Sequence, residues 1–210
     1  MQGQVSFLNQ EKAHFFDQNV NEAWAAHEYG PKEAPKIKRL LAESCFKKGL
    51  RVLEPGCGTG RLTRVMAKVV GNKGMVTALD ISQGMAQACK DRNSDLENVE
   101  VHQACVEDFS HSSPPLFDRI ICHQVFPHFD DQELACRAMS GMLKPGGILA
   151  VIHFEKSGFI NDVHRKAGTV VEKDLIPEQA EMEKLLASHN LITDLLVEDK
   201  LGYYLRAVKS

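Results

Sequence analysis

The sequence predicts an α/β fold: a doubly wound, mostly parallel sheet that ends in an antiparallel C-terminal hairpin. Three observations predict it. Short apolar segments alternate with amphipathic segments from residue 50 to residue 190, a pattern typical of a parallel sheet covered by helices on both faces. A glycine-rich turn joins the first strand-like segment to the helix that follows. The last two strand-like segments, within residues 191–209, have only a short connection and should pair antiparallel.

The first 48 residues read as helical. Apolar residues recur near helical spacing in residues 5–18 and 34–46, Gly30-Pro31 separates the two pieces, and Gly49 ends the second. We therefore expect residues 1–48 to form N-terminal cap helices, not an independent domain, and residues 49–210 to form one Rossmann-like domain.

The elements of that domain follow from periodicity and end signals. Apolar residues fall on one face of residues 59–71, as in an amphipathic helix. Ser82 is a plausible N-cap of the next helix. The segment that begins at residue 130 opens with acidic residues, which interact favourably with the dipole at the start of a helix. The expected strands are 50–55, 74–80, 98–104, 117–124 and 146–154. The expected helices are 59–71, 82–93, 130–143 and 177–190, with His164 on a further helix.

Composition excludes several classes of protein. Lys and Arg number 25 and Asp and Glu number 28, so the formal net charge is −3 and no basic stripe for nucleic acid is expected. No apolar run approaches the roughly 18 residues of a membrane span. The first residues lack the plan of a secretion signal, and the six cysteines contain no C-x-x-C pair, as expected of reduced thiols in a cytoplasmic protein. The sequence leaves open whether the protein forms a homodimer.

The segment "EPGCGTG", residues 54–60, lies where an open α/β sheet binds its ligand. A dinucleotide fingerprint beginning at Gly56 needs a third glycine at position 61, which is Arg61, so the spacing speaks against a pyrophosphate. Asp80 ends the second strand and can accept hydrogen bonds from two ribose hydroxyls. Glu54 suits a cationic amino group. An adenosine joined to an amino acid fits both carboxylates.

Four segments together resemble the successive motifs of the class I S-adenosylmethionine-dependent methyltransferases. They are "VLEPGCGTGRLT", "VTALDIS", "FDRIICHQVFPHFDD" and "LKPGGIL". The resemblance covers residues 35–155 well and implies a seven-stranded sheet with an antiparallel hairpin at one edge. It also implies that the helices before the first strand help to cover the cofactor and the substrate. Phe15, Phe16, Trp24 and Tyr29 either cap the substrate or simply pack these helices on the sheet.

The resemblance also assigns cofactor contacts. The residues expected at S-adenosylmethionine are Glu54, Gly56, Cys57, Gly58, Thr59, Gly60, Asp80, Ile81, Cys105, Val106 and His123. The turn would hold the methionine end, Asp80 the ribose, and Ile81 the adenine. Where the family commonly has Gly-Asp after the third strand, this chain has Ala104 and Cys105. The carboxylate for the adenine amino group is therefore missing or shifted to Glu107 or Asp108, and the backbone N–H of Val106 can serve instead.

Three histidines are candidate catalytic residues because they follow the fourth and fifth strands: His123, His128 and His153. They allow three interpretations. They form a packed, hydrogen-bonded wall; one of them is a general base, since a pKa near 6.5 suits proton removal at neutral pH; or they bind a metal together with Glu155 or His164. No pair has H-x-x-x-H spacing, so we expect no metal.

The sequence thus predicts a methyltransferase that transfers a methyl group from S-adenosylmethionine to a small-molecule acceptor. One alternative is a non-catalytic cofactor- or metal-binding protein on the same fold. The other is a nicotinamide-dependent reductase, which lacks support because no Tyr-x-x-x-Lys occurs among Tyr29, Tyr203 and Tyr204. The sulfonium is already an activated methyl donor, so the protein needs to align the acceptor and exclude water.

Overall fold

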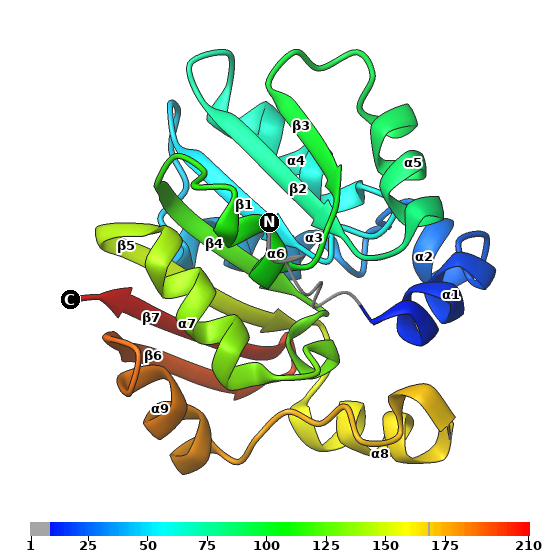
Figure 1. Ribbon diagram of the computed structural model, residues 1–210, viewed down its shortest axis with the longest axis vertical. Helices are drawn as coiled ribbons and strands as arrows, with labels where there is room; N and C mark the ends of the chain where they lie inside the picture. Colours follow the sequence, from blue (N-terminus) through cyan, green and yellow to red (C-terminus); the bar gives the residue numbers. More distant parts are fainter. Residues whose placement is uncertain (1–8, 168) are drawn as a thin grey trace, which may run out of the picture.

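A computed structural model describes residues 9–167 and 169–210, which form one seven-stranded sheet with helices on both faces (Figure 1). The strand order is β3-β2-β1-β4-β5-β7-β6. The first five strands run parallel, and β7 pairs antiparallel with both β5 and β6. The chain moves outward from β1 to β3 and then returns to place β4 beside β1. Ligands of open α/β sheets bind at this switch point.

The strands span β1 Arg51–Pro55, β2 Met75–Asp80, β3 Val99–Gln103, β4 Phe117–His123, β5 Leu143–His153, β6 Leu191–Asp199 and β7 Gly202–Lys209. The α-helices are α1 Gln10–Gln18, α2 Ala23–Ala26, α3 Ala34–Glu43, α4 Arg61–Val70, α5 Gln83–Arg92, α6 Val106–His111, α7 Gln132–Met142, α8 Ser157–Ala167 and α9 Gln179–Ala187. Two 3₁₀ turns, η1 Phe126–His128 and η2 Thr169–Val171, complete the elements of the described residues.

Alternate residues of the central strands, such as β1, are buried in two different cores. Val52 of β1 packs with Leu62 and Met66 under α3 and α4, whereas Leu53 packs on the opposite face with residues of α7 and α9. Both strand residues are fully buried. This period-two alternation fixes the register, because a shift by one residue would exchange the two faces. The carboxyl ends of β1, β2 and β4 are thereby held level with one another.

Three helices lie on the side toward which the parallel strands run. Figure 1 shows α1 and α2 in blue and α8 in yellow at this end of the sheet. Asn9 caps α1 by accepting from the N–H of Lys12, and α8 buries none of its described side chains in the core. These helices therefore cover the carboxyl ends of the strands instead of either sheet face.

The predicted fold class is confirmed, including the seven strands and the C-terminal hairpin. The prediction missed α6, because a helix of six residues is too short to show a period, and began β5 three residues late. The expected N-terminal helix at residues 5–18 starts at Gln10, and residues 5–8 lie outside the described part. The division into a cap of residues 1–48 and a domain of residues 49–210 stays a prediction.

Two smaller findings bear on the sequence-based expectations. In the described part of the chain, no helix is long and apolar enough to cross a membrane. The six cysteines are free, and five of them are buried while Cys45 is exposed. Burial of free thiols agrees with a role as small core hydrophobes.

Candidate active site

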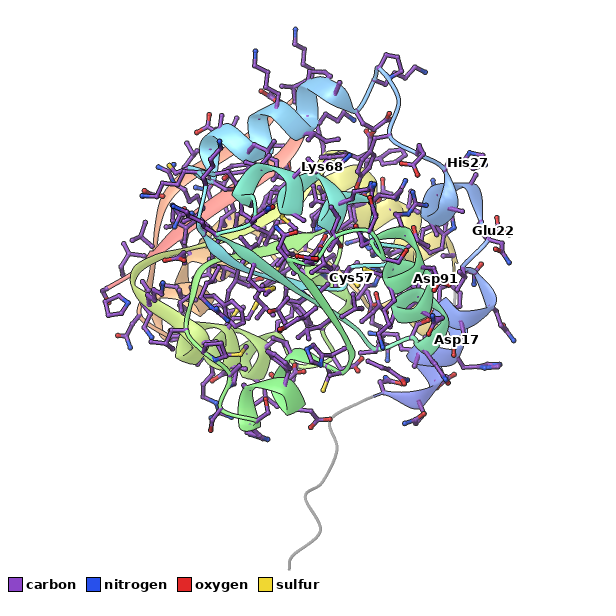
Figure 2. The ribbon with its side chains drawn as sticks, turned by 90° about the horizontal axis from the view of Figure 1, so that it is seen from above. Asp17, Glu22, His27, Cys57, Lys68 and Asp91 are labelled. Atoms are coloured by element: carbon purple, nitrogen blue, oxygen red, sulfur yellow. The ribbon has the colours of Figure 1, made fainter. Side chains whose placement is uncertain are left out.

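A cavity of about 460 Å³ opens at the carboxyl ends of β1, β2, β4 and β5. Its floor is the glycine turn after β1, and its walls include side chains from α1, α2 and α8. Figure 2 shows Cys57 of the turn in the interior of the molecule and His27 and Glu22 on its outer side, near α2. The cavity therefore lies between the sheet and the N-terminal helices.

The three glycines of the turn have positive φ angles, but they serve different purposes. A Cβ atom on Gly56 would lie 2.2 Å from Cγ2 of Val125, so this glycine permits close packing against the loop after β4. A Cβ atom on Gly58 would meet no atom within 4 Å, which leaves the backbone open to the cavity. Gly60 faces inward against Cys89 and does not line the cavity. Gly60 is the N-cap residue of α4, and the cofactor contact expected at Gly60 stays a prediction.

Glu54 is buried at the end of β1, where its side chain is 2% exposed and lines the cavity. Thr63 of α4 donates its hydroxyl hydrogen to Oε2 at 2.5 Å. Burial raises the pKa of Glu54 well above its usual value, although the hydrogen bond from Thr63 acts in the opposite direction. Among the described residues, no Lys or Arg forms an ion pair with Glu54. A buried carboxylate of this kind is stabilised by a cationic ligand.

Asp80 ends β2 and is held in place by the backbone. The N–H of Gly58 donates to its Oδ2 at 2.8 Å, and the N–H of Ser82 donates to its Oδ1 at 2.9 Å. Burial raises the pKa of Asp80 to about 6, and the two N–H donors limit this rise. Each carboxylate oxygen keeps a second lone-pair site that can accept from a ligand hydroxyl.

Arg61 stands where a dinucleotide fingerprint requires its third glycine, and it connects α2 to the end of the turn. Its guanidinium donates to the carbonyl oxygens of Trp24 at 2.6 Å and of His27 at 2.8 Å, and it stacks over the ring of Tyr29 at 4.7 Å. Thr59 also contributes by donating its hydroxyl hydrogen to the carbonyl of Ala25. The turn and the start of α4 therefore hold the N-terminal segment in place over the cavity.

The cover also contacts α5. Asp17 of α1 accepts hydrogen bonds from the Ser82 hydroxyl and from the backbone N–H of Gly84, and Figure 2 shows it beside α5. Phe15, Phe16, Trp24 and Tyr29 all line the cavity, which agrees with the first of the two roles considered for them, a cover over the substrate space. Trp24 is nevertheless 54% exposed, which places it at the rim.

The wall after β3 lacks a carboxylate. Ile81, Cys105 and Val106 line the cavity as predicted, whereas Glu107 and Asp108 are not among its lining residues. Cys105 caps α6, because its Sγ accepts from the N–H of Asp108 at 3.4 Å. The Cys105 thiol thus serves as the helix cap, and the backbone N–H of Val106 stays the candidate donor to the adenine on this wall.

The three candidate catalytic histidines share this cavity with His164 of α8. His123 and His153 are 8% and 2% exposed, and the Nε2 atom of each lacks a hydrogen-bond partner among the described residues. Burial lowers the pKa of His123 to about 3 and that of His153 well below its usual value. The pKa of His153 also responds to the charges of His123, His128 and His164, so all four imidazoles face one region. None of the described residues forms a metal-binding group.

His128 differs from His123 and His153 because its ring contacts a carboxylate, that of Asp174. Its Nδ1 lies 2.7 Å from Oδ2 of Asp174, in the loop before α9, and Lys12 of α1 contacts Oδ1 of the same carboxylate at 3.0 Å. Lys12 is only 2% exposed and Asp174 only 8%. Sequence reasoning missed both residues, since their partners lie 162 and 46 positions away along the chain. A lysine on a polar helix and an aspartate in a loop carry no local signal of burial.

Comparison with known proteins agrees with this geometry. Residues 46–205 match a family described as "Methyltransferase domain". A curated demethylmenaquinone methyltransferase of Staphylococcus aureus (strain MRSA252) is 30% identical over 149 residues, which cover 69% of this chain and 61% of that protein. The matched region thus spans less than two thirds of the length of this relative.

Solved structures show the same fold at low identity. A SAM-dependent methyltransferase from Aquifex aeolicus superposes with a TM-score of 0.65 at 20% identity and covers 95% of this chain and 97% of its own. The N-methyltransferase NodS from Bradyrhizobium japonicum WM9, in complex with S-adenosyl-L-homocysteine, gives 0.69 at 17% identity and covers 94% and 97%. The family predicted from the four motifs is confirmed by the match over residues 46–205. The chain belongs to the methyltransferase-domain family, and its fold is that of the class I S-adenosylmethionine-dependent methyltransferases.

Proposed function

We propose that the protein transfers a methyl group from S-adenosylmethionine to a small, largely apolar acceptor. One observation carries this proposal: a single cavity joins two buried carboxylates at the ends of β1 and β2 to a wall of aromatic and imidazole side chains. The first part suits a nucleoside joined to an amino acid, and the second suits a ring-shaped or aliphatic acceptor. Each part borders the glycine turn, so both ligands can meet there.

The residues present fit the cofactor. Glu54 is a buried carboxylate without a cationic partner among the described side chains, which suits the amino group of the methionine part. Asp80 retains lone pairs for ribose hydroxyls, and Gly58 leaves the backbone uncovered beside it. Ile81 and the N–H of Val106 border the space for the adenine. When bound, the cofactor supplies an activated methyl group; the protein orients it and excludes water.

The acceptor side is mostly apolar. Its lining includes Phe15, Phe16, Phe129, Ile160 and Val163. Such a surface favours a ligand that buries apolar area and makes a few directed polar contacts. The relatives named for demethylmenaquinone suggest a naphthalene-type ring as a test acceptor. A cavity of about 460 Å³ is in the range of small-molecule sites.

The test has two stages. The purified protein is first analysed by mass spectrometry for small molecules that copurify with it. It is then incubated with S-adenosylmethionine and fractions of a small-molecule extract, and formation of S-adenosylhomocysteine is measured. Turnover that depends on an extract fraction and is lost in Asp80→Asn supports the proposal. Binding of the cofactor without turnover in any fraction supports instead the non-catalytic alternative.

The wider setting is proposed on composition alone. A formal net charge of −3 gives no electrostatic support for a nucleic-acid acceptor, so we infer a free small molecule as substrate. We also propose a cytoplasmic location, consistent with free thiols at six cysteines. A homodimer is tested directly by sedimentation of the purified protein.

A further inference from the structure

His128, Asp174 and Lys12 form a buried chain of polar contacts at the histidine wall. Lys12 Nζ donates to the Asp174 carboxylate at 3.0 Å, to Asp130 Oδ1 at 2.7 Å and to the carbonyl oxygen of His128 at 2.9 Å. Asp174 Oδ2 in turn lies 2.7 Å from Nδ1 of His128. Because an ionised carboxylate can only accept, Nδ1 carries the proton and Nε2 keeps its lone pair.

The lone pair is available to a ligand. His128 lines the cavity, and its side chain retains 16% exposure. Among the described residues, the one hydrogen bond of the His128 ring is at Nδ1. The ring of Phe16 packs edge-on against the imidazole at 5.3 Å between centroids and restricts its rotation. The chain of contacts thus presents one oriented proton acceptor to the acceptor side of the cavity.

The surrounding charges suit a base at neutral pH. Burial raises the pKa of the Asp174 carboxyl, but contacts with His128 and Lys12 lower it below its ordinary value, so Asp174 is ionised. Burial lowers the pKa of His128, although Asp174 acts in the opposite direction. The titratable and charged groups that face His128 are Lys12 from α1, His153 from β5, His164 from α8, and Asp174 before α9. His128 is therefore neutral at pH 7, and Asp174 stabilises its protonated form.

His164 is the competing base and is less suited to the task. Its Nδ1 donates to the backbone carbonyl of Asp174, and its ring centroid lies 4.8 Å from that of His128. A neutral carbonyl stabilises an imidazolium less than a carboxylate does. His123 and His153 have no carboxylate partner among the described residues and have pKa values lowered by burial. Of the four imidazoles, only His128 combines an oriented lone pair with an acid behind it.

We propose that His128 is the general base of methyl transfer, that Asp174 is its positioning residue, and that the acceptor carries a hydroxyl group on an apolar ring. This inference rests on the proposed function. The Nε2 lone pair of His128 takes the hydroxyl proton, and the electron pair of the O–H bond stays on the oxygen, which becomes the methyl-accepting nucleophile. The methyl group comes from the cofactor, whose sulfur retains the pair of the broken carbon–sulfur bond. The proton then leaves the imidazolium for solvent.

The activity test uses 1-naphthol and 2-naphthol as acceptors and cofactor labelled in its methyl group, with 1-methoxynaphthalene as the blank. We expect labelled naphthyl ether from the wild type. His128→Asn should lower kcat about 100-fold, as removal of a general base commonly does, with little change in KM. Asp174→Asn should lower kcat about 10-fold, and Asp174→Glu should recover part of that loss. His14→Asn, at an exposed site on α1, is the matched control and should match the wild type.

A second measurement does not need an acceptor. Nitrogen NMR of the protein without ligands should show His128 protonated at Nδ1 and unprotonated at Nε2 at pH 7. In Asp174→Asn, the pKa of His128 should fall further, because the carboxylate that favours the charged form has gone. The acid limb of kcat against pH, expected below 6.5, should move to lower pH in that variant by the same amount. A merely structural role of Asp174 would leave both midpoints unchanged.

Each possible outcome overturns a different part of the proposal. Loss of cofactor binding in the wild type defeats the proposed function itself. Cofactor binding without transfer to either naphthol overturns the hydroxyl-ring acceptor. Transfer that survives His128→Asn at all pH values, or an acid limb that disappears in His164→Asn and persists in His128→Asn, overturns the assignment of the base. Thermal unfolding of each variant identifies any loss that comes from misfolding, and the NMR tautomer then decides.

Discussion

The cavity has two halves, and they differ in what satisfies their buried polar groups. The half that we propose for the cofactor, here called the cofactor half, consists of Glu54, Asp80 and the glycine turn between residues 56 and 60. Backbone N–H groups and a nearby hydroxyl hold its carboxylates. The histidine half consists of His123, His128, His153 and His164. The Nε2 atoms of His123 and His153 have no hydrogen-bond partner within residues 9–167 and 169–210. In the cofactor half, hydrogen bonds join Glu54 and Asp80 to the turns and the helix beside them. The second half relies on contacts between α1, α8 and the loop before α9.

This difference has an energetic consequence. Buried polar atoms without a hydrogen-bond partner lower the free energy of unfolding. Proteins retain such atoms mainly where a ligand supplies the missing partner. A ligand in the cofactor half therefore adds hydrogen bonds at the free lone pairs of Asp80 and compensates the charge of Glu54. The histidine half gains hydrogen-bond partners. We expect substitutions in the two halves to separate cofactor binding from acceptor chemistry.

The largest effect is expected at Asp80. Asp80→Asn keeps the shape of the side chain but removes the negative charge that would accept from the ribose hydroxyls. Charge-assisted hydrogen bonds are worth about 2–4 kcal/mol together, so the dissociation constant for S-adenosylmethionine should rise about 30-fold to 1,000-fold. Calorimetric titration measures it. The matched control is Asp95→Asn, an exposed partner of Arg64 far from the cavity, and an equal effect there would contradict the assignment.

The pH dependence of stability should have opposite signs in the two halves. The pKa of His123 is lowered from 6.5 to about 3, so the free energy of unfolding gained from its neutral form is present above pH 6.5 and is lost as pH falls toward 3. The pKa of Asp80 is raised to about 6, so its burial destabilises the fold above pH 6, and acidification from pH 6 toward 3.8 relieves that cost. Each group contributes a slope of up to about 1.4 kcal/mol per pH unit.

Denaturant unfolding between pH 4 and 7 measures these slopes. His123→Phe, whose ring can pack on Phe154 and Tyr29, should flatten the loss of stability on acidification. Asp80→Asn should make that loss steeper, because the opposing contribution has gone. Slopes that change in the same direction in both variants would show that the two halves do not differ in this way.

A smaller effect separates two glycines of one turn. Gly56→Ala places a methyl group 2.2 Å from Val125 at a positive φ, so the free energy of unfolding should fall by about 2 kcal/mol. Gly58→Ala meets no atom within 4 Å, and backbone strain alone should cost about 1 kcal/mol. Its methyl group enters the ligand space, however. Gly58→Ala should therefore weaken cofactor binding more than it weakens the fold, and the reverse order would contradict the placement of the cofactor.

The smallest effect concerns the cover over the cavity. Arg61→Gln removes the two hydrogen bonds to α2 and the stacking on Tyr29. Because Arg61 is partly exposed, we expect a loss of about 1 kcal/mol, seen as a rise of about fivefold in the dissociation constant for the cofactor with an unchanged melting temperature. Lys68→Gln on the outer face of α4 is the control, and Figure 2 shows this residue away from Cys57. Identical affinities would show that α2 needs no tie to the turn.

The sequence predicted the sheet, and it placed Glu54, Asp80 and the glycine turn at the strand ends that line the cavity, because these signals are local. The glycines, Glu54 and Asp80 sit at strand ends that periodicity locates, and turn chemistry limits what can stand there. It did not show that Gly60 packs against Cys89, because spacing alone does not tell which neighbours a glycine faces. The sequence left three roles open for the histidines, because the choice among these roles depends on the contacts of Asp174 and Lys12. Their burial arises only when α1 packs against the loop before α9.

We expect the turn at residues 54–60 to bind S-adenosylmethionine and not a dinucleotide. Calorimetric titration of the wild-type protein with S-adenosylmethionine, S-adenosylhomocysteine and NAD at pH 7.5 tests it most directly. We predict one site per chain with a dissociation constant in the micromolar range, about −8 kcal/mol, for the first two ligands and no measurable heat for NAD. Tight binding of NAD with no response to S-adenosylmethionine would contradict the account.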